Sequence, residues 1–120
     1  MGKVLGEISV TFDDGTERKF KVRRKKYTES SRVLAMLRAA GTLKKTDDDR
    51  LIIEAGSLDV EKWAAYQIEL IRMSVGDDDG KPNLKTEEID DWGIQNIGAV
   101  CSAIDDFVGP AKTSIDHAGN

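Results

Sequence analysis

Apolar and polar residues alternate through the first part of the chain with a period of two, as they do in a half-buried β-strand. The alternation covers residues 4–12, stops at Asp13-Asp14-Gly15, and resumes over residues 18–24. Two alternating runs joined by a short loop of Asp and Gly are typical of a β-hairpin. We therefore predict an N-terminal hairpin.

The length of the loop decides which residues of this hairpin face one another. A two-residue loop, Asp14-Gly15, pairs Ile8 with Lys21 and mixes apolar and charged side chains on each face. A three-residue loop that ends at Gly15 pairs Ile8 with Phe20 and keeps one face apolar. We predict the second register because it provides a continuous apolar surface for packing.

Later segments repeat apolar residues every three to four positions, the spacing that places them on one face of an α-helix. Three helices are expected, and the run Leu51-Ile52-Ile53 before the second one predicts a third short strand. The helices and the residues expected to cap them are 28–40 with Thr28 or Ser30, 60–73 with Ser57 or Asp59, and 86–108 with Thr86, the last ended by Gly109-Pro110. We expect the last two helices to pack antiparallel, with Trp63 and Trp92 largely buried.

These elements together predict an α+β fold, in which an N-terminal β-hairpin and a third short strand pack with about three α-helices. The 120 residues suffice for one hydrophobic core, so residues 1–110 are expected to form a single domain. Residues 111–120 are small and polar, which predicts a flexible C-terminal tail.

Charge is distributed unevenly along the chain. The net charge is −4, yet residues 1–46 hold 12 Lys/Arg against 5 Asp/Glu, and residues 47–120 hold 6 against 17. The strongest basic run is Arg23-Arg24-Lys25-Lys26, which could contact nucleic acid, attract an acidic protein, or form a solvated strand end. Only Tyr27 stands beside it as a base-stacking aromatic, so the pattern favours the solvated strand end over nucleic acid.

The composition indicates a cytoplasmic protein. No apolar run reaches the roughly 18 residues that a membrane-spanning helix needs, and the N-terminus lacks the apolar core and cleavage pattern of a signal peptide. Cys101 is the only cysteine, so the chain cannot form an internal disulfide, which fits a reducing compartment. We expect no membrane partner.

No set of residues in the sequence predicts catalysis. His117, the only histidine, falls in the expected tail, and Cys101 falls in the last helix, where a cysteine is usually a small buried hydrophobe. The acidic turn at residues 77–80 is similar to a calcium loop, but Val75 and Thr86 stand where its first and last carboxylate ligands belong. We therefore expect no enzyme activity, no metal and no cofactor.

The tract Asp77-Asp78-Asp79-Gly80-Lys81-Pro82, followed by Thr86-Glu87-Glu88-Ile89, resembles tail assembly chaperones of long-tailed bacteriophages. Those short acidic proteins often carry a "D-x-D-G-K-P" tract ahead of a "T-x-E-x-[IL]" helix start, and they tend to begin with a β-hairpin. The resemblance implies a protein of the host cytoplasm that binds the tape-measure protein. It would keep the long hydrophobic helices of that partner from aggregating and help to recruit tail-tube subunits.

Two other functions stay open at this stage: a small structural or adaptor component of the virion, whose hairpin would join a neighbour's sheet, and a nucleic-acid-binding protein built on the basic run. The expected partner-binding residues are apolar positions of the second helix and the basic residues after the hairpin. They are Tyr66, Ile68, Met73, Arg23, Arg24, Lys25 and Lys26. The basic residues would steer an acidic partner. The alternative for the apolar three is that the first helix or the hairpin covers them.

Overall fold

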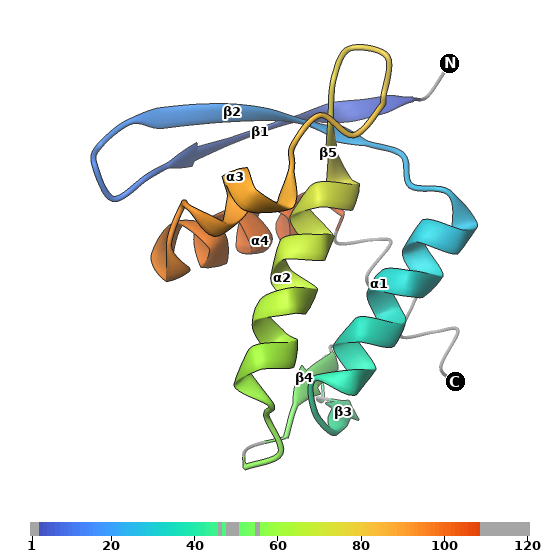
Figure 1. Cartoon of the computed structure of the whole chain (residues 1–120). Helices are drawn as coiled ribbons and strands as arrows, with labels where there is room; N and C mark the ends of the chain where they lie inside the picture. Colours follow the sequence, from blue (N-terminus) through green and yellow to red (C-terminus); the bar gives the residue numbers. More distant parts are fainter. Residues whose placement is uncertain (1–2, 46, 48–50, 55, 109–120) are drawn as a thin grey trace.

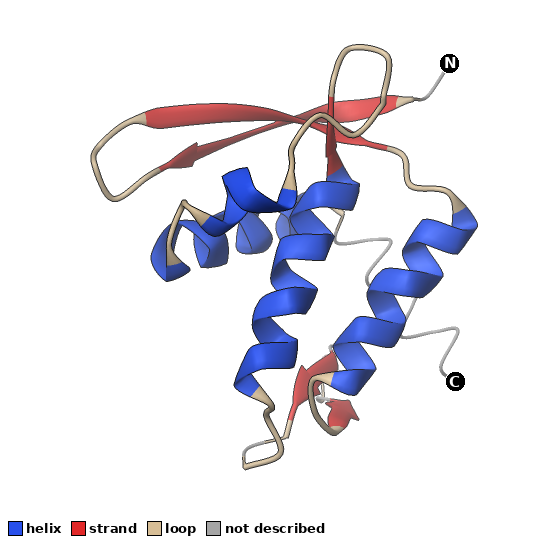
Figure 2. Cartoon of the chain, viewed as in Figure 1, coloured by secondary structure: helices blue, strands red, loops and turns tan. Residues whose placement is uncertain are grey.

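The fold is an α+β arrangement in which a hairpin lies across one end of a group of helices (Figure 1). A computed structural model describes residues 3–45, 47, 51–54 and 56–108. The elements, in chain order, are β1 (Val4–Thr11), β2 (Glu17–Arg23), α1 (Tyr27–Ala39), β3 (Leu43–Lys45), β4 (Leu51–Ile53), α2 (Val60–Ser74), β5 (Val75–Gly76), α3 (Thr86–Asp90) and α4 (Ile94–Phe107). The helices α3 and α4 lie under the hairpin, and α1 and α2 extend away from it (Figure 2). The predicted stop at Gly109-Pro110 and the predicted tail fall outside the described residues.

The hairpin has the predicted register. Ile8 pairs with Phe20 across the two strands, and the loop closes through a hydrogen bond of 2.8 Å from the Phe12 amide to the Thr16 carbonyl oxygen. Gly15 ends the loop with φ of 83°, a conformation in which a residue with a side chain is strained. The side chains that point toward the helices are buried at Ile8, Val10, Phe12 and Val22. The apolar face of the hairpin therefore covers one side of the hydrophobic core.

The third strand of this sheet is β5 and not the segment that we predicted. Val75 pairs with Val22 and Gly76 with Lys21, so the sheet order is β1-β2-β5. The predicted strand at Leu51–Ile53 does form, as β4, but it pairs with β3 in a separate two-stranded sheet. The reason is local: β3 lies only a few residues before β4, whereas α2 delivers β5 directly to the edge of β2. A strand of two residues has no periodicity that could be recognised in the sequence.

The first helix begins at a different residue from the one predicted. α1 starts at Tyr27, and the carboxylate of Glu29 accepts a hydrogen bond of 2.8 Å from the amide of Lys26. A glutamate in the first turn therefore satisfies the backbone group that precedes the helix, and neither Thr28 nor Ser30 acts as the cap.

Of the caps predicted for the two later helices, one is confirmed and the other is wrong. Asp59 precedes α2, and its Oδ1 accepts a hydrogen bond of 3.1 Å from the amide of Lys62, as expected. At α3 the cap position is Lys85 and not Thr86, and the Glu88 carboxylate accepts the Lys85 amide at 3.2 Å. Glutamates at the third position of α1 and α3 thus accept hydrogen bonds from the amide of the residue that precedes each helix.

The predicted helix over residues 86–108 is divided in two at Gly93. This residue has φ of 84°, which breaks the right-handed helical path between α3 and α4. The change of direction brings α4 under the hairpin, where it packs against both α2 and β1. We expected this helix to pack antiparallel to α2, but α4 crosses α2 instead (Figure 1).

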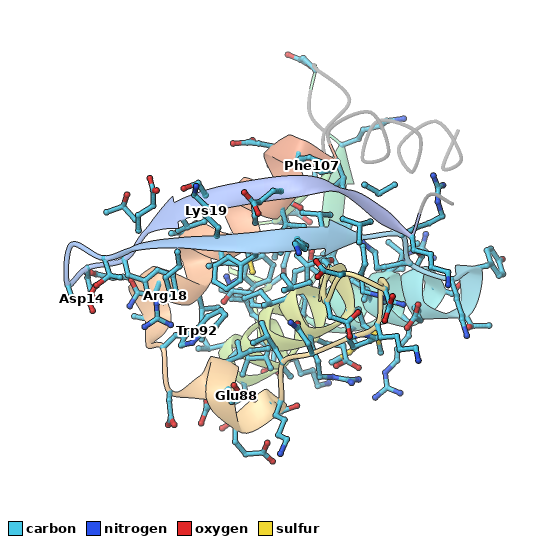
Figure 3. The ribbon with its side chains drawn as sticks, turned by 90° about the horizontal axis from the view of Figure 1, so that it is seen from above. Asp14, Arg18, Lys19, Glu88, Trp92 and Phe107 are labelled. Atoms are coloured by element: carbon cyan, nitrogen blue, oxygen red, sulfur yellow. The ribbon has the colours of Figure 1, made fainter. Side chains whose placement is uncertain are left out.

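Both tryptophans, which we predicted to be largely buried, are partly buried and pack against the core cluster. Trp92 packs beneath the hairpin, with its ring centroid 5.4 Å from that of Phe12 and 5.4 Å from that of Phe20 (Figure 3). Trp63 lies against Tyr66 at 5.2 Å. The largest fully buried side chains are Ile71, Ile89, Ile104, Val22, Val75, Val100 and Ser74.

A buried asparagine joins the hairpin loop to the start of α4. The Asn96 side chain accepts a hydrogen bond of 2.9 Å from the amide of Asp13 and donates one of 3.0 Å to the Asp13 carboxylate. Its Nδ2 also donates to the Trp92 carbonyl oxygen at 2.8 Å. Asn96 is only 6% exposed, whereas Asp13 is exposed, so these bonds lie at the border between the core and the solvent. They link the N-terminal hairpin to helix α4.

We expect Asn96→Ala to lower the free energy of unfolding by about 1–3 kcal/mol, because it removes the three hydrogen bonds that its side chain makes to Asp13 and Trp92. Gln95→Ala is the matched control, since Gln95 is the exposed neighbour on the same helix, and it should change stability far less. Urea unfolding followed by circular dichroism measures both. Equal effects for the two variants would show that Asn96 is not the link described here.

Candidate binding groove

A buried arginine connects four parts of the fold. Arg23 is 5% exposed and stands at the end of β2. Its Nε donates to the Gly80 carbonyl oxygen at 2.7 Å, and its Nη1 donates to the Met73 carbonyl oxygen at 2.6 Å. The guanidinium also contacts both carboxylate oxygens of Glu29, at 3.1 and 3.3 Å. It thereby joins β2 to the 77–81 turn, to the last turn of α2 and to the first turn of α1.

The environment of Arg23 explains why a cation is stable inside this fold. The carbonyl oxygens in the last turn of a helix lack intrahelical partners and carry partial negative charge, and Met73 supplies one of them. Glu29 supplies a full negative charge. Burial alone would raise the pKa of Glu29, but the Lys26 amide and the Arg23 guanidinium outweigh it and hold that pKa below the ordinary value. Arg23 is thus part of the core and not of a solvated strand end.

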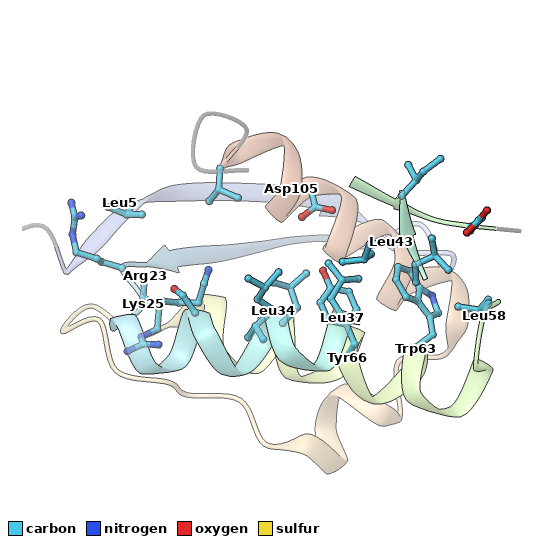
Figure 4. Close-up of a pocket in the computed structure, with 18 of the residues that line it drawn as sticks. Leu5, Arg23, Lys25, Leu34, Leu37, Leu43, Leu58, Trp63, Tyr66 and Asp105 are labelled. Atoms are coloured by element: carbon cyan, nitrogen blue, oxygen red, sulfur yellow. The ribbon is translucent and has the colours of Figure 1, made fainter. Parts of the chain in front are cut away.

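An apolar groove of about 810 Å³ lies beside this junction (Figure 4). Helix α1 contributes one wall and α2 the other, while the small β3–β4 sheet, β1 and the end of α4 close its borders. The apolar side chains that line it are Leu5, Val33, Leu34, Leu37, Leu43, Ile52, Ile53, Leu58, Trp63, Tyr66, Leu70 and Val108. The size and the apolar lining are typical of ligand and peptide sites in proteins.

The border of the groove exposes large apolar side chains to water. Leu5 is 42% exposed, Ile52 46% and Leu58 44%. These residues come from β1, from β4 and from the segment that precedes α2, so three separate parts of the chain contribute exposed apolar side chains to the groove. A single exposed leucine is ordinary on a protein surface, but a grouped set around a groove is typical of an interaction site.

A lysine lies among these apolar walls. Lys25 is half-buried, and its Nζ donates a hydrogen bond of 3.1 Å to the hydroxyl of Ser74. Burial, together with the neighbouring Arg23, lowers the pKa of Lys25, because both disfavour its positive charge. Asp105 also lines the groove and acts in the opposite direction.

The structure brings four of the predicted partner-binding residues into this groove. Arg23, Arg24, Lys25 and Tyr66 all line it, although Arg23 and Tyr66 are buried in its floor. Lys26 is exposed and does not line the groove.

The other two predicted residues belong to the core. Met73 is buried, and Ile68 is half-buried and packs against the core cluster. Together with the burial of Tyr66, this leaves the apolar trio without a common exposed surface. The sequence interpretation missed Leu34, which stands next to Val33 and widens the apolar stripe of α1 toward the groove.

The remaining chemically interesting residues serve the fold. The Cys101 thiol is buried, contacts the Gln67 carbonyl oxygen at 3.6 Å, and has its pKa raised to about 12 by burial. A thiol in that state is a poor nucleophile. In the acidic turn, Asp77 Oδ1 accepts the amides of Asp79 at 2.9 Å and Lys81 at 3.0 Å, which organises the turn. Within the described part of the chain, no three potential metal ligands come together; His117 lies outside it.

Comparison of the chain with protein-family models, with curated proteins and with solved structures finds no match. Among the helices of the described ranges, none combines the length and the apolar character needed to cross a membrane.

We expect Arg23→Ala to destabilise the protein by about 3–5 kcal/mol, because it removes one member of a buried ion pair and leaves two carbonyl oxygens unpaired. Arg38→Ala, an exposed arginine in the last turn of α1, is the control and should stay within about 0.5 kcal/mol of the wild type. Chemical denaturation measures the difference. A loss for Arg23→Ala as small as that of the control would contradict the role assigned to Arg23.

Acidification should destabilise the fold below the ordinary glutamate pKa of 4.5. The pKa of Glu69 is lowered mainly by its hydrogen bonds to Arg72, and that of Glu29 is also lowered. A depressed pKa in the folded state means that the stabilisation is complete above 4.5 and is lost as the pH falls through the folded value. The free energy of unfolding, measured from neutral pH downward, should fall less steeply in Glu69→Gln than in the wild type. The exposed Glu61→Gln should retain the wild-type slope; identical slopes for all three proteins would refute the prediction.

Proposed function

We propose that this protein is a non-catalytic tail assembly chaperone that binds an apolar helical segment of the tape-measure protein in the groove between α1 and α2. The observation that carries the proposal is the groove itself, an open cavity of about 810 Å³ with exposed leucine and isoleucine side chains among its lining residues. An amphipathic helix that lays its apolar face in such a groove buries hydrophobic surface on both partners.

The acidic turn that resembles the chaperone family lies next to this groove. Its Gly80 carbonyl oxygen accepts a hydrogen bond from Arg23, and Arg23 lines the groove. The turn therefore helps to fix the position of Arg23, the residue that joins β2, α1 and α2. The turn that carries the resemblance is therefore bonded to a residue of the proposed binding groove, which supports the chaperone proposal. The proposal implies that the protein acts in the host cytoplasm and helps to recruit tail-tube subunits.

A second candidate function, a structural or adaptor component of the virion, is favoured by the position of β1. This strand of eight residues is at one edge of the sheet, where its outer backbone groups could pair with a neighbour's strand. The basic run gives less support to nucleic-acid binding, because Arg23 is buried and Lys25 is half-buried, which leaves Arg24 and Lys26 as its exposed members.

Co-expression with the tape-measure protein encoded beside it tests the chaperone proposal. We expect the wild-type protein to keep that partner in the supernatant and to co-purify with it. Leu34→Arg should abolish the complex, because it places a charge in the apolar wall of the groove. Ala35→Arg, at the exposed neighbouring position of α1, is the matched control and should retain the complex.

Thermal unfolding of both variants must first show that each is folded. If the partner is equally soluble with and without this protein, and no complex is recovered, the chaperone proposal fails. A protein that is then found in assembled particles would favour the virion component. Loss of the complex in both variants would place the binding surface elsewhere on α1.

A further inference from the structure

A lysine amine lies inside the apolar groove. Lys25 lines the cavity together with Leu34 and Leu37, and it is half-buried, so a small molecule can still reach it from solvent (Figure 4). Its Nζ donates a hydrogen bond of 3.1 Å to the hydroxyl of Ser74. A hydroxyl is a neutral partner that accepts a hydrogen bond from an amine as well as from an ammonium group. Lys25 therefore keeps this bond whether or not it carries its third proton.

Burial and three charged side chains decide how readily Lys25 loses that proton. Burial has the largest effect and disfavours the charged form, and the buried guanidinium of Arg23 disfavours it as well. The carboxylates of Glu29 on α1 and of Asp105 on α4 act in the opposite direction, and the first two effects outweigh them. The pKa of Lys25 is therefore below the ordinary value for lysine, and more of this amine is neutral at neutral pH than in a fully solvated lysine.

A neutral amine next to an apolar cavity is a nucleophile toward carbonyl carbon. Lysines that form imines are activated by a hydrophobic pocket or by a neighbouring cation, and Lys25 has both. The Nζ lone pair adds to the carbonyl carbon of an aldehyde, whose oxygen takes up a proton. The resulting carbinolamine loses one water to leave a C=N bond, so the step needs no oxidant or reductant.

We propose that Lys25 is a site of covalent modification by aliphatic aldehydes, in which the groove holds the hydrocarbon chain while Nζ forms an imine with the carbonyl carbon. The apolar walls supply the preference for a long chain, because they remove its surface from water. The inference rests on the groove and not on the partner that the proposed function assigns to it.

Reductive alkylation of the full-length wild-type protein at neutral pH tests the inference. Propanal and hexanal are supplied in separate reactions with cyanoborohydride, which reduces each imine to a stable secondary amine, and mass spectrometry of the digested protein gives the rate at each lysine. Hexanal should modify Lys25 about tenfold faster than propanal, because its three additional methylene groups are buried in the groove. Lys26 is the internal control, since it is exposed and outside the groove, and its rate should change by less than about twofold.

Two pairs of variants separate the effect of charge from that of the apolar walls. Asp105→Asn removes a carboxylate that favours the ammonium form, so it should increase the rate at Lys25 severalfold with both aldehydes, whereas the exposed neighbour Asp106→Asn should not. Leu34→Gln makes the groove wall polar and should remove the preference of Lys25 for hexanal, whereas Ala35→Gln on the exposed side of α1 should retain it. Thermal unfolding identifies the variants that are folded, and the wild-type comparison of Lys25 with Lys26 stands without them.

Equal rates at Lys25 and Lys26 with hexanal would overturn the inference, and so would a rate at Lys25 that does not depend on chain length. An unchanged rate at Lys25 in folded Asp105→Asn would contradict the part assigned to the neutral amine. None of these results bears on the co-expression experiment, which uses the unmodified protein and decides the proposed function separately.

Discussion

The ion pair between Arg23 and Glu29 is the interaction on which the arrangement of the elements depends. A hairpin of this size is marginal without a partner layer, and the helices cover it only if their ends are held against it. Arg23 does this by binding backbone oxygen atoms of α2 and of the 77–81 turn, while Glu29 fixes the start of α1. Because the pair is buried, it favours one relative placement of these elements over others.

Patterns within single elements made much of this fold predictable. The alternation around Gly15 determined the register of the hairpin, because shifting it by one residue would have placed Lys21 on the face that Phe20 occupies. The apolar spacing also identified the helices, and Asp59 was recognised as a cap from its position alone. These features depend on residues close together in the sequence, so their physical causes are visible there.

What could not be predicted depends on contacts between distant residues. The basic run that begins at Arg23 has the composition of a solvated strand end. Arg23 is buried only because the fold brings the carbonyl oxygens of Met73 and Gly80 to its guanidinium group. In the same way, the groove combines Leu34 with Leu5 and Leu58, which no periodicity connects. The predicted helix over residues 86–108 ran through Gly93, whose positive φ of 84° is evident only in the folded chain. The sequence therefore identified three cations and Tyr66 among the residues that line the groove, but not the other apolar side chains of its walls.

The direct passage from α2 into β5 has a mechanical consequence. Ser74 ends the helix and Val75 is already paired with β2, so no flexible linker separates the two elements and they move as one body. On the other side of the groove, α1 is held at both ends. Glu29 in its first turn pairs with Arg23, and the carbonyl oxygen of Ala40, which follows its last turn, accepts a hydrogen bond of 2.8 Å from the amide of Asp59 at the start of α2. The two walls are therefore fixed to each other at each end, so we expect the groove to keep its width and to select its occupants by size.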